Sequence, residues 1–417
     1  MNIGYACITA GNITSNYRTI TKKYLTEEKL IEVVEHNLNT LEEIIDYNIL
    51  NNIKLFRITS DLIPFGSSPL NTISWENIFF NRFIKIGEKI RNAGIRVSMH
   101  PGQYTIINSP RDNVIENSIE DLIYHNKILD LLGSDNKSKI ILHIGGVYDD
   151  KDNAKKRFIE NYNRLSDDIK NRLVIENDHN SYNIIDVLDI SSKCDIPVVF
   201  DNLHHDINKE IDGKSDYYWI TQTQKTWTSK DGLQKIHYSQ QDIGKTPGAH
   251  SNTINLRIFK EYLDANIIND LDIMLEVKDK NLSAIKINNL VNNSHISDLE
   301  IEWSKYKYNI LEKSPESYNS IRQLLKDKES YPIFDFYDLI DIGLGTQSSI
   351  GNKINGIEHV WGYFKKSATE KEKEEYKRLL NKLKEDVKYE KRIKKYLFAM
   401  ANKYNEKYLL NSYYFLI

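Results

Sequence analysis

The fold is decided by the stretch from residue 140 to residue 201, which reads IILHIGGVYDDKDNAKKRFIENYNRLSDDIKNRLVIENDHNSYNIIDVLDISSKCDIPVVFD. It contains the short apolar runs Ile140–His143, Leu173–Glu176 and Pro197–Phe200. The segments between these runs carry apolar residues at helical spacing. Short apolar runs that alternate with amphipathic helices are typical of parallel strands joined by crossover helices. This stretch therefore predicts parallel strands connected through helices.

The same alternation extends outward over the first 295 residues. Strands are predicted at Ile3–Cys7, Leu55–Thr59, Ile95–Met99, Ile140–His143, Leu173–Glu176, Pro197–Phe200, Leu233–His237 and Ile273–Val277. Helices are predicted after Thr26 and near Trp75–Arg91, Val114–Leu132, Ala154–Ile169, Ile184–Cys194, Leu256–Leu263 and Ala284–Val291. This count matches an α/β fold of the (β/α)8 TIM-barrel type. An open doubly wound sheet is the alternative, but the sequence has no glycine-rich dinucleotide turn after its first strand and no phosphate loop.

The character of the chain changes near residue 300, where Tyr and Lys become dense and strand patterns fade. We predict a barrel domain over residues 1–300 and a helical C-terminal extension over residues 301–417. Amphipathic helices are expected at Glu370–Leu383 and Lys391–Leu410, whereas Pro332–Gly356 is expected to be irregular because it holds several Gly and Ser. Residues 365–407 hold 15 Lys/Arg and 8 Asp/Glu, although the whole chain has a net charge of −3.

Composition excludes several classes of protein. The 417 residues are 40% hydrophobic and 28% charged, as in a soluble globular protein. No apolar run reaches the length of about 18 residues that a membrane helix needs, and the N-terminus lacks a secretion leader. Cys7 and Cys194 cannot build a disulfide scaffold and suit a reducing compartment. We therefore expect a cytoplasmic protein without membrane contact.

Metal-competent side chains gather at the predicted strand ends. The residues at or just past the eight ends are Tyr5, Ser60, His100, His143, Glu176, Asp201, His237 and Glu276. His204 and His250 fall in the loops after the sixth and seventh strands. The carboxyl ends of barrel strands meet at one rim, which is where TIM-barrel active sites lie. Five of the 11 histidines and three carboxylates are therefore predicted to share that rim.

Burial of these groups is unfavourable unless something compensates their charge and polarity, and divalent cations can compensate several groups at once. Imidazole and carboxylate ligands suit Zn²⁺ or Mn²⁺, and the lack of thiolates argues against a structural zinc finger. The ligands exceed the needs of one ion, so two or three ions are predicted, as in phosphodiester hydrolysis. Any single histidine could instead be an ordinary surface or hydrogen-bonded residue, and only the joint placement favours a metal centre.

Eight short motifs, spread over essentially residues 1–295, make the sequence similar to a known protein family. They are Arg57-Ile-Thr-Ser-Asp-Leu-Ile-Pro-Phe65, Met99-His-Pro-Gly-Gln-Tyr104, Leu142-His-Ile-Gly-Gly146, Ile175-Glu-Asn-Asp178, Phe200-Asp-Asn-Leu-His-His205, Lys235-Ile-His-Tyr-Ser239, Gly248-Ala-His-Ser251 and Met274-Leu-Glu-Val-Lys278. Each motif alone is weak, but their order makes the chain resemble the UV damage endonuclease family. The resemblance implies a barrel related to endonuclease IV and xylose isomerase with a centre of three metal ions, often Mn²⁺, with Zn²⁺, Mg²⁺ and Co²⁺ as alternatives.

The resemblance also implies roles for individual residues. One ion would be held by His100, His143 and Glu176; a second by Glu176, Asp201, His237 and Glu276; and a third by His204 and His250. Glu176, His237, Glu276 and Lys235 would be catalytic. Lys235 matches a family lysine that can be carboxylated into a further metal ligand, although its residue type alone suggests a solvated lysine.

DNA-contacting residues follow from the same resemblance. Gln103 and Tyr104 match a pair that enters the duplex where a damaged dinucleotide has been extruded, although a packing role is the alternative. A planar ring can replace lost stacking, and an amide can bond to orphaned bases. Tyr5 and Asn12 are expected to line the lesion pocket, and Arg57 is a candidate phosphate contact.

The function predicted from the resemblance is hydrolysis of DNA immediately 5′ to UV photoproducts, leaving a 3′-hydroxyl and a 5′-phosphate. The partner would be UV-damaged double-stranded DNA, with no obligatory protein partner. An abasic-site endonuclease, a metal-dependent sugar isomerase and a non-catalytic DNA-binding protein are the alternatives. The C-terminal motifs Gly362-Tyr-Phe-Lys-Lys366 and Tyr408-Leu-Leu-Asn-Ser-Tyr-Tyr-Phe415 faintly resemble a small helical domain of unknown function. Its basic helices could follow DNA phosphates or simply form a solvated face.

Overall fold

The computed structural model describes residues 1–10, 16–209, 213–267 and 270–416. They form two compact units; the first ends at Ile285, and the second comprises the residues from Lys286 onward together with Ala10. Eight parallel strands of the first unit form a closed barrel in sequence order. The strands are β1 (Asn2–Ala6), β2 (Leu55–Ile58), β3 (Arg96–Met99), β4 (Ile140–His143), β5 (Leu173–Glu176), β6 (Val198–Asp201), β7 (Lys235–Tyr238) and β8 (Asp272–Leu275). The predicted TIM barrel is confirmed.

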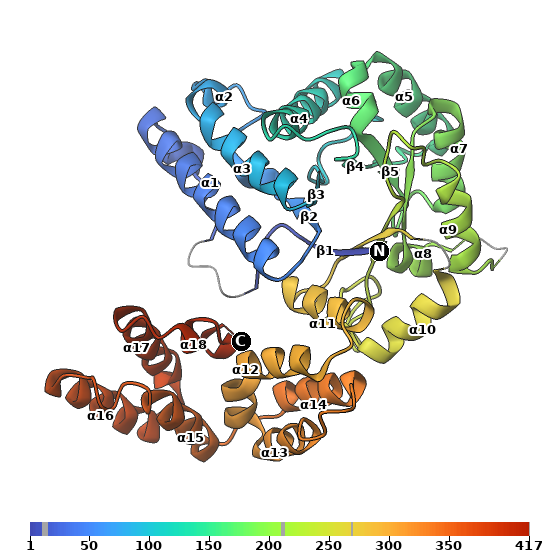
Figure 1. Ribbon diagram of the computed structural model, residues 1–417. Coiled ribbons are helices and arrows are strands. Elements are labelled where there is room, and N and C mark those ends of the chain that lie inside the picture. Colours follow the sequence, from blue (N-terminus) through green and yellow to red (C-terminus); the bar gives the residue numbers. More distant parts are fainter. Residues whose placement is uncertain (11–15, 210–212, 268–269, 417) are drawn as a thin grey trace. The chain divides into compact units, whose positions relative to one another are not determined.

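Helices surround the barrel strands (Figure 1). They are α1 (Glu27–Leu50), α2 (Trp75–Ile78), α3 (Phe80–Asn92), α4 (Asp112–Leu131), α5 (Lys151–Arg164), α6 (Asp167–Arg172), α7 (Ile184–Cys194), α8 (Asn202–Ile207), α9 (Asp216–Gln224) and α10 (Leu256–Asn266), with 3₁₀ turns η1 (Lys22–Tyr24) and η2 (Ser60–Leu62). Helix α11 (Asn281–Val291) follows β8. The Thr26 side chain caps α1 by accepting a hydrogen bond from the Lys29 amide, as its sequence setting predicts.

Strand β1 pairs with β8 and closes the barrel, with Asn2 opposite Asp272 and Ile3 opposite Ile273. Every residue of β5, β6, β7 and β8 is buried. Such strands read as continuous apolar runs because both faces of a parallel sheet are covered. The predicted strand ends are correct to within one or two residues, so the polar residues at the ends keep their positions.

The helices of the second unit are α12 (Ile296–Lys313), α13 (Pro315–Leu324), α14 (Ile333–Gly345), α15 (Ile350–Trp361), α16 (Glu370–Glu385), α17 (Glu390–Lys403) and α18 (Lys407–Leu410), with the short turns η3 (Val387–Tyr389) and η4 (Tyr413–Phe415). Its core is a cluster rich in aromatic and leucine side chains, in which Trp361 and Tyr376 stack with ring centroids 4.0 Å apart. The predicted C-terminal helical region is therefore present.

The prediction that Pro332–Gly356 is irregular is wrong, because the segment contains α14 and most of α15. Its glycines allow close helix packing. A Cβ atom built on Gly343 would lie 2.8 Å from Ile310 Cδ1, and one on Gly356 would lie 2.9 Å from Glu312 Cβ. Both neighbours belong to α12, so the glycines mark where α14 and α15 approach that helix.

No helix in the described part of the chain is long and apolar enough to cross a membrane. Cys7 and Cys194 are both free thiols, and Cys194 is buried at the end of α7. The two free thiols agree with the expectation that Cys7 and Cys194 do not form a disulfide scaffold.

Candidate metal centre and DNA-binding site

Strand alternation brings the predicted ligands to one mouth of the barrel. His143, Glu176 and Asp201 end β4, β5 and β6, and the register sets His143 beside Glu176. Side chains two positions apart on a strand share a face. The residues two positions earlier, Ile141, Val174 and Val199, are buried together in an apolar cluster. The polar mouth therefore rests on an apolar layer, which limits access of water from below.

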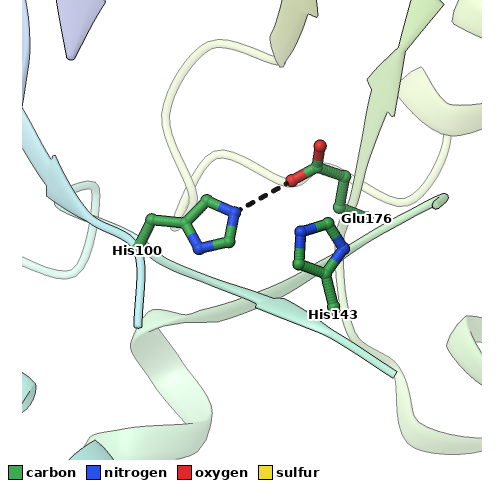
Figure 2. Close-up of side chains that lie close together, drawn as sticks. All are labelled: His100, His143 and Glu176. Carbon is green, nitrogen blue, oxygen red and sulfur yellow. Dashed lines mark ion pairs between the residues drawn. The ribbon is translucent and has the colours of Figure 1, made fainter. Parts of the chain in front are cut away.

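Glu176 is the centre of the arrangement. His100, which follows β3, and His143 lie around it, and Figure 2 shows the three side chains facing one another. His100 Nε2 is 3.4 Å from Glu176 Oε2, and the rings of His100 and His143 are 5.0 Å apart between centroids. One ligand atom from each residue lies within 4.8 Å of the others. These three residues can therefore hold one metal ion together.

Glu176 also belongs to a second metal-competent group, with Asp201 and His237. Its Oε1 atom lies 3.0 Å from His237 Nδ1, and all three side chains are buried. A carboxylate with two oxygens can serve neighbouring ions, one through each oxygen or both through one. The structure thus places Glu176 where the sequence analysis expected a bridging ligand.

Several buried ligand atoms of the two metal-competent groups lack hydrogen bonds, which suits them to bind cations. His143 Nδ1, Glu176 Oε2, Asp201 Oδ2 and His237 Nε2 are buried, and no described residue hydrogen-bonds to them. Leaving one such polar atom unsatisfied costs about 1–3 kcal/mol, and more for a charged group. Nitrogen and oxygen donors without sulfur suit Zn²⁺ or Mn²⁺. A divalent cation would satisfy several of these atoms together.

The electrostatics favour the same conclusion. Burial alone would raise the pKa of Glu176, but the imidazoles of His237 and His143 hold that pKa well below its usual range. Burial raises the pKa of Asp201 to about 6 and lowers the pKa of His143 to about 4. At neutral pH both carboxyl groups are therefore ionised and His143 is neutral. These are the protonation states in which the three residues bind metals.

The remaining predicted ligands surround this centre at different distances. His204 Nδ1 lies 3.5 Å from Glu176 Oε1 and 3.7 Å from Asp201 Oδ1. Glu276 Oε1 lies 3.4 Å from His237 Nδ1. His250 is in neither metal-competent group of the described residues, although the charges of Glu276 and His204 act on it. The third ion expected between His204 and His250 thus stays a prediction.

Arg57 differs from its expected role as a phosphate contact. Its guanidinium lies 2.5 Å from Glu276 Oε1, and the Arg57 side chain is only 11% exposed. Burial by itself disfavours the charged guanidinium, but Glu276 raises the pKa of Arg57 and keeps the pair ionised. A buried charge needs such a partner. Arg57 therefore holds a predicted metal ligand in place.

Lys235 is fully buried, so its interpretation from residue type alone as a solvated lysine is wrong. It lies two positions before His237 on β7, and its Nζ atom finds no hydrogen-bond partner in the described part of the chain. Burial lowers the pKa of Lys235 well below its usual range. Burial thus disfavours the charged ammonium form of this amine.

Gln103 and Tyr104 occupy a tight turn beside the centre. The Thr105 amide donates to the Gly102 carbonyl at 2.9 Å, so the pair forms the tip, and Tyr104 is 82% exposed. A cavity of about 670 Å³ adjoins the turn and is lined partly by Ser60. An exposed aromatic ring at a turn tip is available to a ligand and contributes little to packing.

Tyr5, another predicted DNA contact, is not exposed in this way. Tyr5 has no exposed surface, and its hydroxyl donates to Asn48 Oδ1 at 2.7 Å. Its expected place on the lesion-pocket wall is therefore not supported, because the ring lies on the side of β1 that faces helix α1, with its centroid 5.2 Å from that of Phe56. Asn12 lies outside the described residues.

Two further residues near the predicted ligands, Asn177 and His179, were not predicted as part of the site. Asn177 is buried and exchanges hydrogen bonds of 2.9 and 3.0 Å with the Asp201 backbone. The backbone carbonyl oxygen of Asn177 lies 3.0 Å from His204 Nδ1. Asn177 therefore orients two predicted ligands, Asp201 and His204. The ring of His179 lies 5.4 Å from that of His204. Both residues stand within three positions of Glu176, which was the available signal.

Comparison with known proteins places this chain in a family. The family model described as UV-endonuclease UvdE matches residues 3–305. A model for a protein family of unknown function, DUF1722, matches residues 307–417. The crystal structure of SacUVDE is similar with a TM-score of 0.64 and 37% identity, covering 70% of this chain and 99% of that one.

Two curated relatives carry the same description. The UV DNA damage endonuclease of Clostridium perfringens is 43% identical over 97% of this chain and 96% of its own length. That of Bacillus cereus is 32% identical over 71% of this chain and 95% of its own length, so it is little longer than the matched region. With a family model that covers the whole barrel and a relative that covers nearly the whole chain, this protein belongs to the UV-endonuclease family.

Proposed function

We propose that the protein is a metal-dependent endonuclease that cuts DNA immediately 5′ to UV photoproducts and leaves a 3′-hydroxyl and a 5′-phosphate. Membership in the UV-endonuclease family supports a nuclease acting on UV-damaged DNA. The observation that carries the metal dependence is the set of buried imidazole and carboxylate atoms that lack hydrogen bonds around Glu176. The cleavage position and the products rest on the family resemblance.

His100, His143, Glu176, Asp201, His237 and Glu276 would hold two divalent ions, and His204 with His250 would hold a third. Such ions would supply hydroxide near neutral pH and neutralise charge on the reacting phosphate. Mn²⁺ is the proposed metal, and Zn²⁺ fits the same donors. The protein contributes the orientation: Asn177 fixes Asp201 and His204, and Arg57 fixes Glu276.

Lys235 is proposed to be carboxylated at Nζ and so to become a further metal ligand. Its amine would add to CO₂, forming a carbamate and releasing one proton. Three properties support this: the amine is buried, its pKa is lowered by burial, and no described residue hydrogen-bonds to it. The intact mass of the protein in bicarbonate buffer decides the matter.

Recognition of the lesion is assigned to Gln103 and Tyr104. Their exposed turn belongs to the same loop as the predicted ligand His100. A photoproduct weakens stacking and pairing, so extruding it costs less than extruding an intact step. An inserted tyrosine ring and glutamine amide would then stabilise the opened duplex.

The proposal is tested by measuring nicking of irradiated and unirradiated supercoiled plasmid, with Mn²⁺ present or chelated. We expect nicking only of irradiated DNA in the presence of metal, and a Glu276→Gln variant should lose nicking. Equal nicking of both plasmids, or nicking that persists in chelator, would contradict the proposal. Labelled duplexes with one pyrimidine dimer or one abasic site then map the cleavage position and separate the abasic-site alternative.

The helical second unit is proposed to add affinity for DNA phosphates through α17. Many of its basic residues are already paired, such as Lys373 with Glu370 and Lys403 with Glu372. Lys391, Arg392 and Lys395 are exposed on α17, and no ion pair is found for them among the described residues. These three exposed side chains are therefore proposed to form ion pairs with DNA phosphates.

Changing Lys391, Arg392 and Lys395 together to glutamine is expected to weaken DNA binding and to lower the salt slope of log K by up to about 3, or about one per phosphate contact. Fluorescence anisotropy over a salt series measures the slope. The matched control changes Lys373, Arg378 and Lys403 to glutamine, which removes equal charge from residues paired within the unit. An equal slope in both variants would assign α17 to a solvated face.

A further inference from the structure

Helix α4 carries a polar stripe made of Ser118, Asp121 and His125. Residues at these spacings of three and four lie on one helix face. His125 is fully buried, and Ser118 is 3% exposed. Burying polar groups beside an apolar core costs free energy unless each one finds a partner. Each residue of this stripe is connected to the loop of residues 100–106, either by a direct hydrogen bond or through Ser60.

The stripe holds the far end of that loop by two hydrogen bonds. Thr105 Oγ1 donates to Asp121 Oδ2 at 2.6 Å. The Ile106 amide donates to Ser118 Oγ at 3.0 Å, and that hydroxyl donates in turn to the Val114 carbonyl within α4. Hydrogen bonds to a charged group are the stronger kind, so the Thr105–Asp121 contact is the main tie at this end.

The near end of the loop is held through Ser60. Its hydroxyl donates to the backbone carbonyl of His100 at 2.7 Å and lies 2.9 Å from His125 Nε2. His125 Nδ1 lies 2.6 Å from the Asp121 carbonyl, which fixes the ring against α4. A chain of contacts thus runs from α4 through His125 and Ser60 to the residue that carries a predicted metal ligand.

Between these two ties stands the exposed turn of Gln103 and Tyr104. The loop therefore carries a metal ligand at one end and the DNA-entering pair at its tip, and a single helix anchors both ends. A turn without fixed ends would lose conformational entropy when it binds DNA, which weakens binding. A turn with fixed ends has little backbone freedom left to lose.

We propose that the polar stripe of α4 is a positioning element that fixes the 100–106 loop, so that His100 and the Gln103–Tyr104 turn keep a constant spatial relation. Ser118, Asp121 and His125 act through the loop and do not touch substrate. The part that concerns lesion binding rests on the proposed function. The part that concerns loop order and metal affinity stands on the contacts alone.

The first test replaces Thr105 by valine, which keeps its shape and removes the donor, and by serine, which keeps the donor. In Thr105→Val, amide hydrogen exchange of residues 102–107 in the metal-free protein is expected to rise about tenfold. KM for a dimer-containing duplex is expected to rise by a similar factor with kcat within about threefold. Thr105→Ser should behave like the parent protein. Thr221→Val, which removes a helix-surface hydroxyl elsewhere, is the matched control.

The second test probes the near end. His125→Gln is expected to weaken Mn²⁺ binding about tenfold, the effect typical of losing a contact behind a metal ligand. His36→Gln, which changes a histidine of α1, is its control. If Thr105→Val proves unfoldable, Ser118→Ala takes its place.

Unchanged exchange in Thr105→Val together with unchanged Mn²⁺ affinity in His125→Gln would overturn the inference. A parent protein that fails to nick irradiated DNA would refute the proposed function, yet the exchange and metal measurements would still decide on the stripe. The two failures are therefore distinguishable.

Discussion

Replacing Glu176 by glutamine is expected to reduce kcat for incision at least about 10³-fold and to reduce the number of bound metal ions. The amide keeps the shape of the side chain but removes the negative charge that faces His100, His204 and His237. Because Glu176 is shared by both metal-competent groups, one substitution damages both. Single-turnover nicking gives the rate, and elemental analysis gives the metal content.

Glu312→Gln is the matched control, because Glu312 is equally buried but lies on α12 of the second unit and belongs to neither metal-competent group of the described residues. It should leave incision and metal content unchanged. A Glu176→Gln protein that retains its full metal content and near-parental kcat would remove Glu176 from the centre of the mechanism.

Replacing Tyr104 by alanine is expected to lower kcat/KM for a dimer-containing duplex by about 10- to 100-fold. Stacking of one base on an aromatic ring is worth about 1–3 kcal/mol, and the exposed ring makes few contacts that alanine would lose in the free protein. Metal content and thermal stability should therefore stay constant. Steady-state kinetics with matched damaged and undamaged duplexes give the size of the effect.

Tyr104→Phe should restore most of the activity, since it keeps the stacking surface. Tyr24→Ala removes another strongly exposed tyrosine, which lies in η1, and serves as the control. If Tyr104→Ala cuts damaged DNA as well as the parent protein does, the turn has no part in lesion recognition and the packing alternative stands.

The ring of metal-competent residues could be predicted because barrel geometry converts sequence position into spatial position. His143, Glu176 and Asp201 each end an apolar run, and parallel strands in sequence order bring such ends together. An error of one residue in a strand end does not move the last residue away from the rim. The prediction thus depended on topology more than on exact boundaries.

Residues whose role depends on a partner far along the chain could not be predicted in this way. Arg57 and Glu276 are 219 positions apart, and only the closed barrel joins them. The burial of Lys235 depends on the same closure, because its residue type favours solvent. Tyr5 was placed at the rim by its strand position, but the strand face that it occupies is fully packed.

The helical region shows a different reason for failure. Gly343 and Gly356 suggested loops, because glycine usually marks turns. In the structure the missing side chain of each glycine makes room for α12, a tertiary requirement that local pattern does not reveal. Conversely, Thr369 and Glu372 form a capping box at the start of α16, and the predicted helix over Glu370–Leu383 is correct.

The pairing of β1 with β8 has a consequence for biosynthesis. Asn2 leaves the ribosome before the rest of the barrel, and its partner Asp272 lies 270 positions further along the chain. Until then the nascent chain exposes the unpaired edges of its first and latest strands, which are sites for aggregation. Glu276 emerges later still, so an interrupted translation product lacks both barrel closure and the last of the predicted metal ligands. Premature termination before that point therefore yields fragments without nuclease competence.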